Sequence, residues 1–182
     1  VQQWLDIHFP GYKVSENSSE IWRDLPKYVV AIVDSKGEKI AEFKFRIEID
    51  SLRIPQIQRE KLSAEQVKER LLFFDYIKIS PIIKGRGLST VLTSYAINKG
   101  VGQGIKRIYT TYGMDNLYAF LQVFNRTGSI KEGVLNSPSG KVFGRLGFFV
   151  NEEMSVAYFD KEWKYRTDEH QYVVKLVFEP TE

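Results

Sequence analysis

Residues 73–92 read FFDYIKISPIIKGRGLSTVL, and this segment organises the chain. Its first part, Phe73–Ser80, predicts an apolar strand that stops at Pro81, because proline cannot donate a hydrogen bond to a sheet ladder. Apolar residues recur at helical spacing from Leu88 onward and predict an amphipathic helix. Between strand and helix lies a basic, glycine-rich loop. Such a loop aims backbone N–H groups and the positive end of the helix dipole at one point, which predicts an anion site suited to phosphate.

Two common phosphate-binding motifs do not fit this loop. A P-loop requires Gly-Lys followed by Ser or Thr after a four-residue gap, and the segment does not contain it. A dinucleotide-binding fingerprint requires a third glycine, where Thr90 stands, and an acidic residue about 20 positions later. No Asp or Glu occurs between Asp75 and Asp115. Both motifs are therefore excluded.

The loop resembles the pyrophosphate-binding motif of the GNAT (Gcn5-related N-acetyltransferase) superfamily. That motif has Arg or Gln, two residues, Gly, one residue, then Gly or Ala, and here Lys84, Gly87 and Ser89 occupy the three positions. Lys84 keeps the positive charge, and Ser89 is the next smallest choice. Both residues depart mildly from the usual pattern.

A second GNAT motif is matched downstream. The family has an Asn, a small residue three positions later, a Tyr seven positions later, and then Gly-Phe at the end of that helix. Asn136, Ser139, Phe143 and Gly147-Phe148 fall in this register. The resemblance covers about residues 28–160. Two motifs in the right order, with a strand pattern between them, identify the chain as similar to this superfamily.

The resemblance implies a fold, a cofactor and a set of binding residues. The fold is α+β, a mixed and largely antiparallel sheet flanked by helices, with splayed central strands that admit the cofactor's pantetheine arm. The cofactor is acetyl-CoA. The residues implied to hold it lie on the central strand, in the loop and in the second motif: Ile77, Ile79, Lys84, Gly85, Arg86, Gly87, Leu88, Ser89, Asn136 and Phe143.

The implied reaction moves an acetyl group from the thioester to a primary amine of a protein or small molecule, by direct attack in a ternary complex. An alkylammonium must first lose a proton, so a base is needed. Asp75 is the expected base, because a carboxylate among aromatic residues on the central strand is desolvated. Glu48 and Asp50 on the preceding strand remain alternatives, and Asp75 can equally be a hydrogen-bonded structural residue.

The departing thiolate needs an acid, which in the family is the tyrosine of the second motif. Here that residue is Phe143, whose ring cannot donate a proton. Ser139, Tyr112 or Tyr118 could supply the hydroxyl group. A catalytically weak or inactive GNAT-fold interaction module is therefore the alternative function.

Composition agrees with a single globular domain spanning residues 1–182. The chain has no cysteine, which excludes disulfides and Cys-ligated metals, and its only histidines are His8 and His170 at opposite ends. We expect no metal site. No stretch reaches the roughly 18 apolar residues of a membrane span, so we expect no membrane segment and a cytoplasmic location.

Charge is distributed unevenly along the chain. Residues 76–148 contain ten Lys or Arg and two acids, which leaves 16 basic and 21 acidic residues elsewhere. This basic segment contains both motifs and would attract a polyphosphate nucleotide. A nucleic acid is the less favoured partner that the same charge allows.

Periodicity predicts the remaining elements. Alternating apolar residues indicate a hairpin of strands 28–34 and 40–50. A capping box at Ser63 and Gln66 indicates a helix that ends near Leu71. The other expected features are an N-terminal helical region in 1–27, insertions at 51–70 and 114–135, a strand at 105–112, a helix at 117–124, a polar loop at 125–133, and strands at 155–159 and 171–178.

Overall fold

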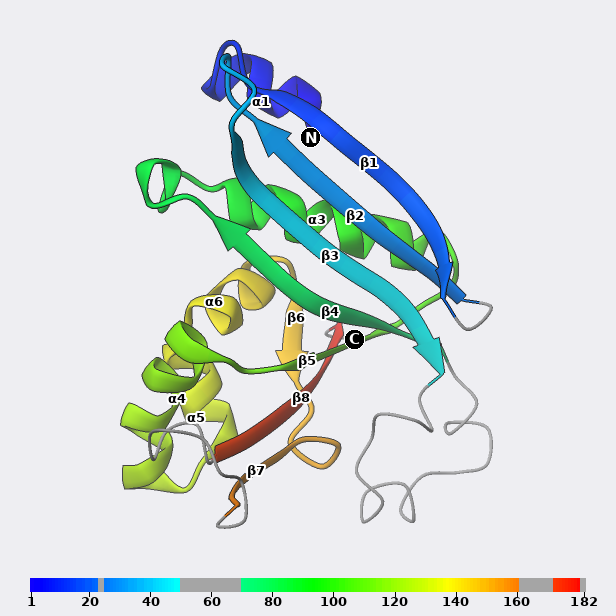
Figure 1. The fold of residues 1–182 in the computed structure, drawn as a ribbon. Coiled ribbons are helices and arrows are strands. Elements are labelled where there is room, and N and C mark those ends of the chain that lie inside the picture. The colour runs from blue at the N-terminus through cyan, green and yellow to red at the C-terminus, as the bar shows by residue number, and fades with distance from the viewer. Residues whose placement is uncertain (23–24, 50–69, 161–171, 181–182) are drawn as a thin grey trace. The chain divides into compact units, whose positions relative to one another are not determined.

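The computed structural model describes residues 1–22, 25–49, 70–160 and 172–180 (Figure 1). They form two compact units. Unit 1 comprises Val1–Glu48 and Leu72–Ile105, and unit 2 comprises Ile49–Leu71 and Lys106–Glu182. The glycine-rich loop belongs to unit 1, whereas the second motif belongs to unit 2.

Unit 1 contains a short helix, four neighbouring strands and one long helix. The strand order is β1-β2-β3-β4, and both β1 with β2 and β2 with β3 pair antiparallel. The predicted hairpin is confirmed. The elements in chain order are α1 (Gln2–His8), β1 (Lys13–Trp22), β2 (Leu25–Val33), β3 (Lys39–Ile49), β4 (Arg70–Ile79), the 3-10 turn η3 (Pro81–Ile83) and α3 (Leu88–Val101).

Helix α3 packs on one face of these strands and lies behind them in Figure 1. On that face the buried rings of Phe43 and Phe45 contact Phe74 and Tyr95, with ring centroids 5.2 Å apart for Phe43–Phe74 and 6.1 Å for Phe45–Tyr95. Near the end of α3, a Cβ on Gly100 would lie 3.4 Å from the side chain of Leu72. The strict alternation of β3 thus gives a buried aromatic face and a polar opposite face, as its sequence predicts.

Strand β8 (Tyr172–Pro180) is the central strand of unit 2. On one edge β8 pairs with β5 (Arg107–Thr111). On the other edge its first half pairs with β7 (Val156–Phe159) and its last residues pair with β6 (Phe148–Val150). All three pairings are antiparallel. The expected strands at 105–112, 155–159 and 171–178 are confirmed, while β6 was not predicted.

Three helices follow β5 in the chain: α4 (Met114–Thr127), α5 (Ile130–Asn136) and α6 (Pro138–Arg145). The predicted polar loop at 125–133 is wrong, because α4 continues to Thr127 and α5 begins at Ile130. Gly128, with φ 67°, ends α4 in the left-handed conformation. Ser129 caps α5 by accepting a hydrogen bond from the Glu132 N–H at 3.2 Å.

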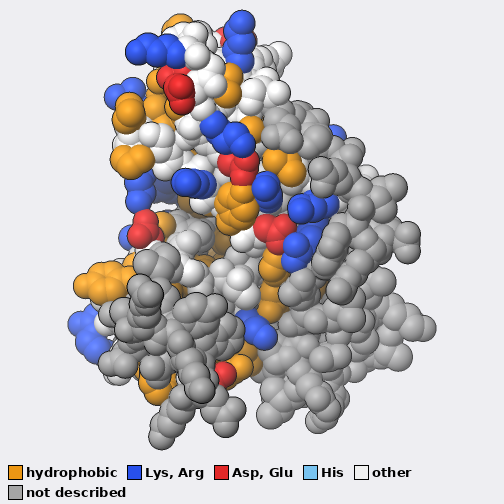
Figure 2. All heavy atoms as spheres, viewed as in Figure 1, with side chains coloured by type: hydrophobic (Ala, Val, Ile, Leu, Met, Phe, Trp, Pro, Cys, Tyr) orange, Lys and Arg blue, Asp and Glu red, His pale blue; other side chains and the backbone are white. Residues whose placement is uncertain are grey.

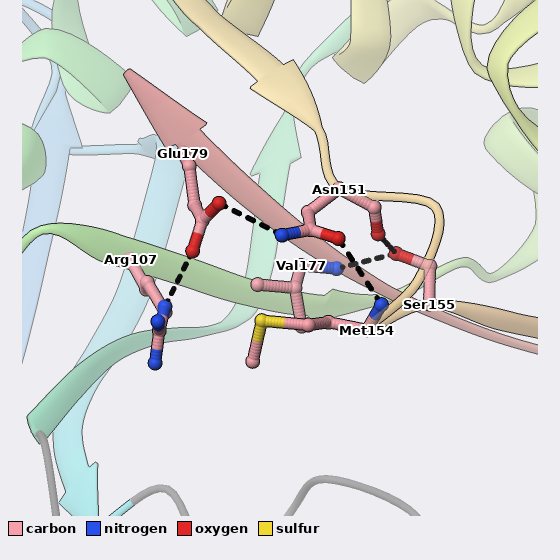
Figure 3. Close-up of polar contacts among 6 residues, drawn as sticks. All are labelled: Arg107, Asn151, Met154, Ser155, Val177 and Glu179. Carbon is pink, nitrogen blue, oxygen red and sulfur yellow. Dashed lines mark hydrogen bonds and ion pairs between the residues drawn. The ribbon is translucent and has the colours of Figure 1, made fainter. Parts of the chain in front are cut away.

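A polar network joins β5, β8 and the residues after β6 in unit 2 (Figure 3). Arg107 Nε donates to Glu179 Oε1 at 2.5 Å, and Asn151 Nδ2 donates to Glu179 Oε2 at 2.8 Å. Ser155 Oγ accepts from the Val177 N–H at 3.0 Å and donates to the Asn151 carbonyl at 2.6 Å. Both oxygens of Glu179 are therefore occupied, and Arg107 is buried with its charge compensated.

The prediction of a helical region in 1–27 needs a correction: among the described residues of this range only α1 is helical, and β1 and the start of β2 are strands. The helix expected from Ser63 and most of the insertion at 51–70 lie outside the described residues. The α+β class and the largely antiparallel pairing are confirmed. The splaying of the central strands stays a prediction. None of the helices in the described part of the chain is long and apolar enough to cross a membrane.

Candidate functional site

The regular alternation of β4 breaks where the expected base lies. Four successive residues, 71–74, are buried, after which Asp75 is half-buried and Tyr76 is exposed. Asp75 contacts Arg46 and Tyr76 contacts Glu42, both on the polar face of β3. Neighbouring residues of a regular strand point to opposite faces. Two that reach the same face indicate an irregularity of the bulge type, which often re-aims side chains beside a functional site.

Asp75 forms an ion pair that the sequence interpretation did not include. Its Oδ1 lies 2.7 Å from Arg46 Nη1, and the Arg46 guanidinium lies 4.5 Å from the centroid of the Phe73 ring. Asp75 is therefore a partly buried carboxylate held by a cation. The side chains of the alternative bases, Glu48 and Asp50, lie outside the part of the structure that is described.

Beside this pair, Glu42 is the centre of a second charged group. It accepts hydrogen bonds from Lys39 at 2.7 Å and from the Tyr76 hydroxyl, and Lys44 lies 3.3 Å away. The hydrogen bond from Lys39 is the largest cause that lowers the pKa of Glu42 below its usual value. Burial opposes it, and the hydrogen bond and the charge of Lys44 lower the pKa further. Figure 2 shows basic, acidic and hydrophobic side chains interspersed over this face.

The glycine-rich loop has the backbone geometry of an anion site. Gly85 and Gly87 take φ values of 83° and 91°, which side chains other than glycine rarely adopt. Gly87 is the N-cap of α3 and provides no side-chain cap, and the first turn of α3 contains no acid. The first helical hydrogen bond comes from the Val91 N–H to the Gly87 carbonyl, at 3.2 Å. Earlier N–H groups of the helix therefore remain available to a ligand.

The remaining residues expected at the cofactor in unit 1 lie along β4 and the loop. Lys84 and Arg86 are exposed, whereas Leu88 is buried and anchors the start of α3. Ile77 is 37% exposed, which is unusual for an isoleucine in a strand, and Ile79 is half-buried. Strand, loop and helix thus bring the predicted cofactor-binding residues of unit 1 into one continuous segment.

In unit 2, Tyr112 is buried at the end of β5, with its hydroxyl 2.5 Å from Ser137 Oγ. Burial raises the pKa of Tyr112 well above its usual value. Ser137 is also fully buried and caps α6 by accepting from the Gly140 N–H at 3.0 Å. Sequence reasoning missed Ser137, although Ser followed by Pro138 is a recognisable helix start.

The second-motif residues have well-defined places within unit 2. Asn136 Nδ2 donates to the Ala119 carbonyl at 2.6 Å and so joins α5 to α4. Phe143 is 2% exposed and packs on Phe178, with ring centroids 4.4 Å apart. The Ser139 N–H donates to Asn116 Oδ1 at 2.8 Å, while its hydroxyl makes no hydrogen bond to any residue that the structure describes.

No protein-family model and no curated protein sequence matches this chain. Solved structures do. A polyamine N-acetyltransferase from Drosophila melanogaster is 11% identical at a TM-score of 0.49, covering 83% of this chain and 74% of that one. Arabidopsis thaliana NAA60, solved with a bisubstrate analogue, is 12% identical at a TM-score of 0.49 and 84% and 73% coverage. A putative phosphinothricin N-acetyltransferase is 16% identical at a TM-score of 0.46 and 89% and 75% coverage. At such identities the likeness concerns the backbone, and function has to be argued from this chain's own residues.

Proposed function

We propose that the protein is an acetyl-CoA-dependent N-acyltransferase of the GNAT type, acting on a primary amine. The observation that carries this proposal is the loop of unit 1, where two glycines with positive φ lead into the uncapped start of α3. Two exposed cations, Lys84 and Arg86, lie in the loop just before that helix start. Backbone donors, helix dipole and positive charge together favour the pyrophosphate of a nucleotide over a neutral ligand.

Chemistry at such a site needs no covalent enzyme intermediate. Bound acetyl-CoA would supply the thioester for direct transfer to the amine, and the protein's own residues would take the proton from the amine, donate to the carbonyl oxygen and protonate the departing thiolate. We assign the base to Asp75 and the oxyanion donor to a backbone N–H of β4 beyond the irregularity. Arg46 keeps the Asp75 carboxylate in one orientation through its contact with Oδ1.

We assign the acid to Ser139. Its hydroxyl has no hydrogen-bond partner within the described residues, whereas the Tyr112 hydroxyl is buried against Ser137. Tyr118 is 59% exposed on α4 and remains a second candidate. CoA thiolate is a tolerable leaving group, so the absence of the usual tyrosine slows transfer rather than preventing it.

The alternative function is an interaction module with the same fold and little or no activity. Two observations favour it. Phe143 is packed on Phe178 inside unit 2, and Asp75 is ion-paired with Arg46. Both contacts would stabilise the fold of a protein that has no catalytic activity.

The deciding experiment is a calorimetric titration with acetyl-CoA, followed by an assay of CoA thiol release with a panel of primary amines. The test variant is Gly87→Glu, which places a carboxylate where the backbone has to approach pyrophosphate. The matched control is Gly37→Glu in the β2–β3 turn. Its φ of 86° is close to the 91° of Gly87, and a Cβ there meets nothing within 4 Å. Both variants therefore carry similar backbone strain and the same added charge.

We expect wild type and Gly37→Glu to bind acetyl-CoA with similar affinity and Gly87→Glu to lose binding. Thiol release that depends on an amine would then support the enzyme. Binding without release for any amine class would support the interaction module instead. Equal binding by all three proteins would show that the loop does not hold the cofactor.

A further inference from the structure

Helix α1 and the residues that follow it bring a group of aromatic rings to the glycine-rich loop within unit 1. The Trp4 ring lies 5.5 Å from Phe9 and 4.6 Å from His8, measured between centroids. Phe9 also stacks on Tyr12 at 5.4 Å. Phe9 is buried, so this group forms part of the unit 1 core as well as part of its surface. Nothing in the two sequence motifs requires aromatic residues here.

Two of these rings lie beside the loop. A Cβ on Gly87 would lie 3.7 Å from Trp4 Cζ2, which is ordinary van der Waals contact. The guanidinium carbon of Arg86 lies 5.7 Å from the centroid of the Phe9 ring, within the range of a cation–π interaction. Trp4 in α1 therefore lies beside the N-cap of α3, and Phe9, the residue at the end of α1, contacts the neighbouring cation.

The nature of the Arg86 contact matters for binding an anion. Arg86 is exposed and makes no ion pair with any residue that the structure describes. An aromatic ring restricts a guanidinium without neutralising it, and the planar fork remains able to donate to phosphate. A carboxylate partner would instead compete with the ligand for the same charge.

We propose that Phe9 and Trp4 are positioning residues for the nucleotide diphosphate: Phe9 holds Arg86 ready for the phosphates, and Trp4 supports the backbone of Gly87. Occupancy of the loop and the packing of α1 are then linked. This inference rests on the proposed function, since it takes the loop's ligand to be CoA. Neither ring has to touch the ligand.

The test is a double-mutant cycle on CoA affinity, measured by calorimetry for wild type, Phe9→Leu, Arg86→Gln and the double variant. Loss of the cation–π contact predicts roughly 2- to 5-fold weaker binding for Phe9→Leu. If Phe9 acts through Arg86, the double variant binds no more weakly than Arg86→Gln alone. Phe9→Tyr retains an aromatic face and restores wild-type affinity. Fully additive effects, or failure of tyrosine to restore affinity, would overturn the proposal.

A control variant distinguishes a direct contact between a positioned Arg86 guanidinium and the phosphates from long-range attraction by any positive charge. Lys36→Gln removes one exposed positive charge in the β2–β3 turn of the same unit. We expect CoA affinity to change much less in this variant than in Arg86→Gln. An equal loss in both would show that Arg86 acts through long-range charge, and the role of Phe9 would fall with it.

A spectroscopic readout follows Trp4 itself. The chain has three tryptophans, so Trp22→Phe with Trp163→Phe leaves Trp4 as the single reporter. Saturating CoA is expected to shift its emission, and unchanged emission at saturation would overturn the linkage. If wild type binds no CoA, the proposed function fails and this inference with it. If wild type binds but the cycle is additive, only the inference about α1 fails.

Discussion

The hydroxyl oxygen of Tyr112 lies 2.5 Å from Ser137 Oγ, and the other contacts of Ser137 determine the direction of this hydrogen bond. Ser137 Oγ donates its own proton to the Val134 carbonyl at 2.8 Å and accepts from the Gly140 N–H at 3.0 Å. It therefore accepts from Tyr112. The phenol proton is held inside unit 2, where it stabilises the start of α6.

Tyr112→Phe should consequently change mainly the stability of the protein, whereas Ser139→Ala should change mainly its activity. Removing the phenol group should lower the free energy of unfolding by about 1–2 kcal/mol and leave acyl transfer nearly unchanged. Removing the Ser139 hydroxyl should lower kcat about 10- to 100-fold, with little change in stability. Urea unfolding and steady-state thiol release measure the two quantities. A folded Tyr112→Phe protein without activity would make Tyr112 the acid.

Gly140→Ala should be among the most damaging single-methyl additions in unit 2. An added Cβ would lie 2.0 Å from the Val134 carbonyl oxygen and 2.8 Å from Ser137 Oγ, so the helix start must shift. We expect a loss of about 3 kcal/mol or more in unfolding free energy. Gly144→Ala in the same helix is the control, because nothing lies within 4 Å of its added Cβ.

At Gly144 the alanine should stabilise α6, by roughly 0.5–1 kcal/mol, through helix propensity. Thermal and urea unfolding of the two variants provide the measurement. Similar stability of both proteins would show that the Ser137 cap is not the tight contact that the structure indicates.

Arg107→Met should destabilise unit 2 by leaving Glu179 without its cation. The Arg107 side chain is 10% exposed and that of Glu179 is 32% exposed, so solvent compensates part of the loss. We expect about 1–3 kcal/mol from urea unfolding. Lys106→Met, at the exposed neighbouring position, should change stability by no more than about 0.5 kcal/mol. Equal effects of the two substitutions would contradict the importance of the network in Figure 3.

Glu42 should make stability depend on pH in a definite direction. Its pKa is lowered in the folded protein from the ordinary value of 4.5, so its contribution is present above that value and is lost as the pH falls below it. Wild type should exceed Glu42→Gln in unfolding free energy near neutral pH by under about 1 kcal/mol, because the Lys39 side chain is 54% exposed and solvent screens the pair. The difference should shrink in urea unfolding as the pH is lowered below 4.5. A difference that grows on acidification would have the wrong sign for this ion pair.

Asp75→Asn tests the proposed base. Loss of a general base should lower kcat about 100-fold or more and remove the acidic limb of the pH–rate profile. The amide also leaves Arg46 without its ion pair, so a modest loss of stability accompanies the change. A stability loss with unchanged kcat would restrict Asp75 to a structural role and move the search to Glu48 and Asp50.

Strong local patterns in the sequence were enough to predict much of unit 1. The alternation in β3 predicts both the strand and its buried face. In the loop before α3, Gly85 and Gly87 indicate a backbone that needs positive φ angles. These features depend on neighbouring residues alone. The capping sequence Ser129–Glu132 carries an equally local signal for α5, which the polar composition of that region obscured.

Features that depend on distant partners could not be predicted. Strand β1 is rich in Ser, Asn and Glu, and its strand conformation comes from pairing with β2 rather than from its own propensity. The Arg46–Asp75 pair depends on the register between β3 and β4, which are separated in the chain by residues 50–69. No pattern within either strand sets that register. The assignment of Asp75 as a base could not anticipate its partner for this reason.

The place of β8 in the chain has a consequence for biosynthesis. Strands β5, β6 and β7 all pair with β8, and all three precede it in the sequence. During translation these three strands leave the ribosome before β8, which among the described residues is their only pairing partner in unit 2. Their unpaired edges stay exposed until residues 172–180 leave the exit tunnel. Unit 1, whose hairpin strands are adjacent in sequence, can begin to fold much earlier during translation.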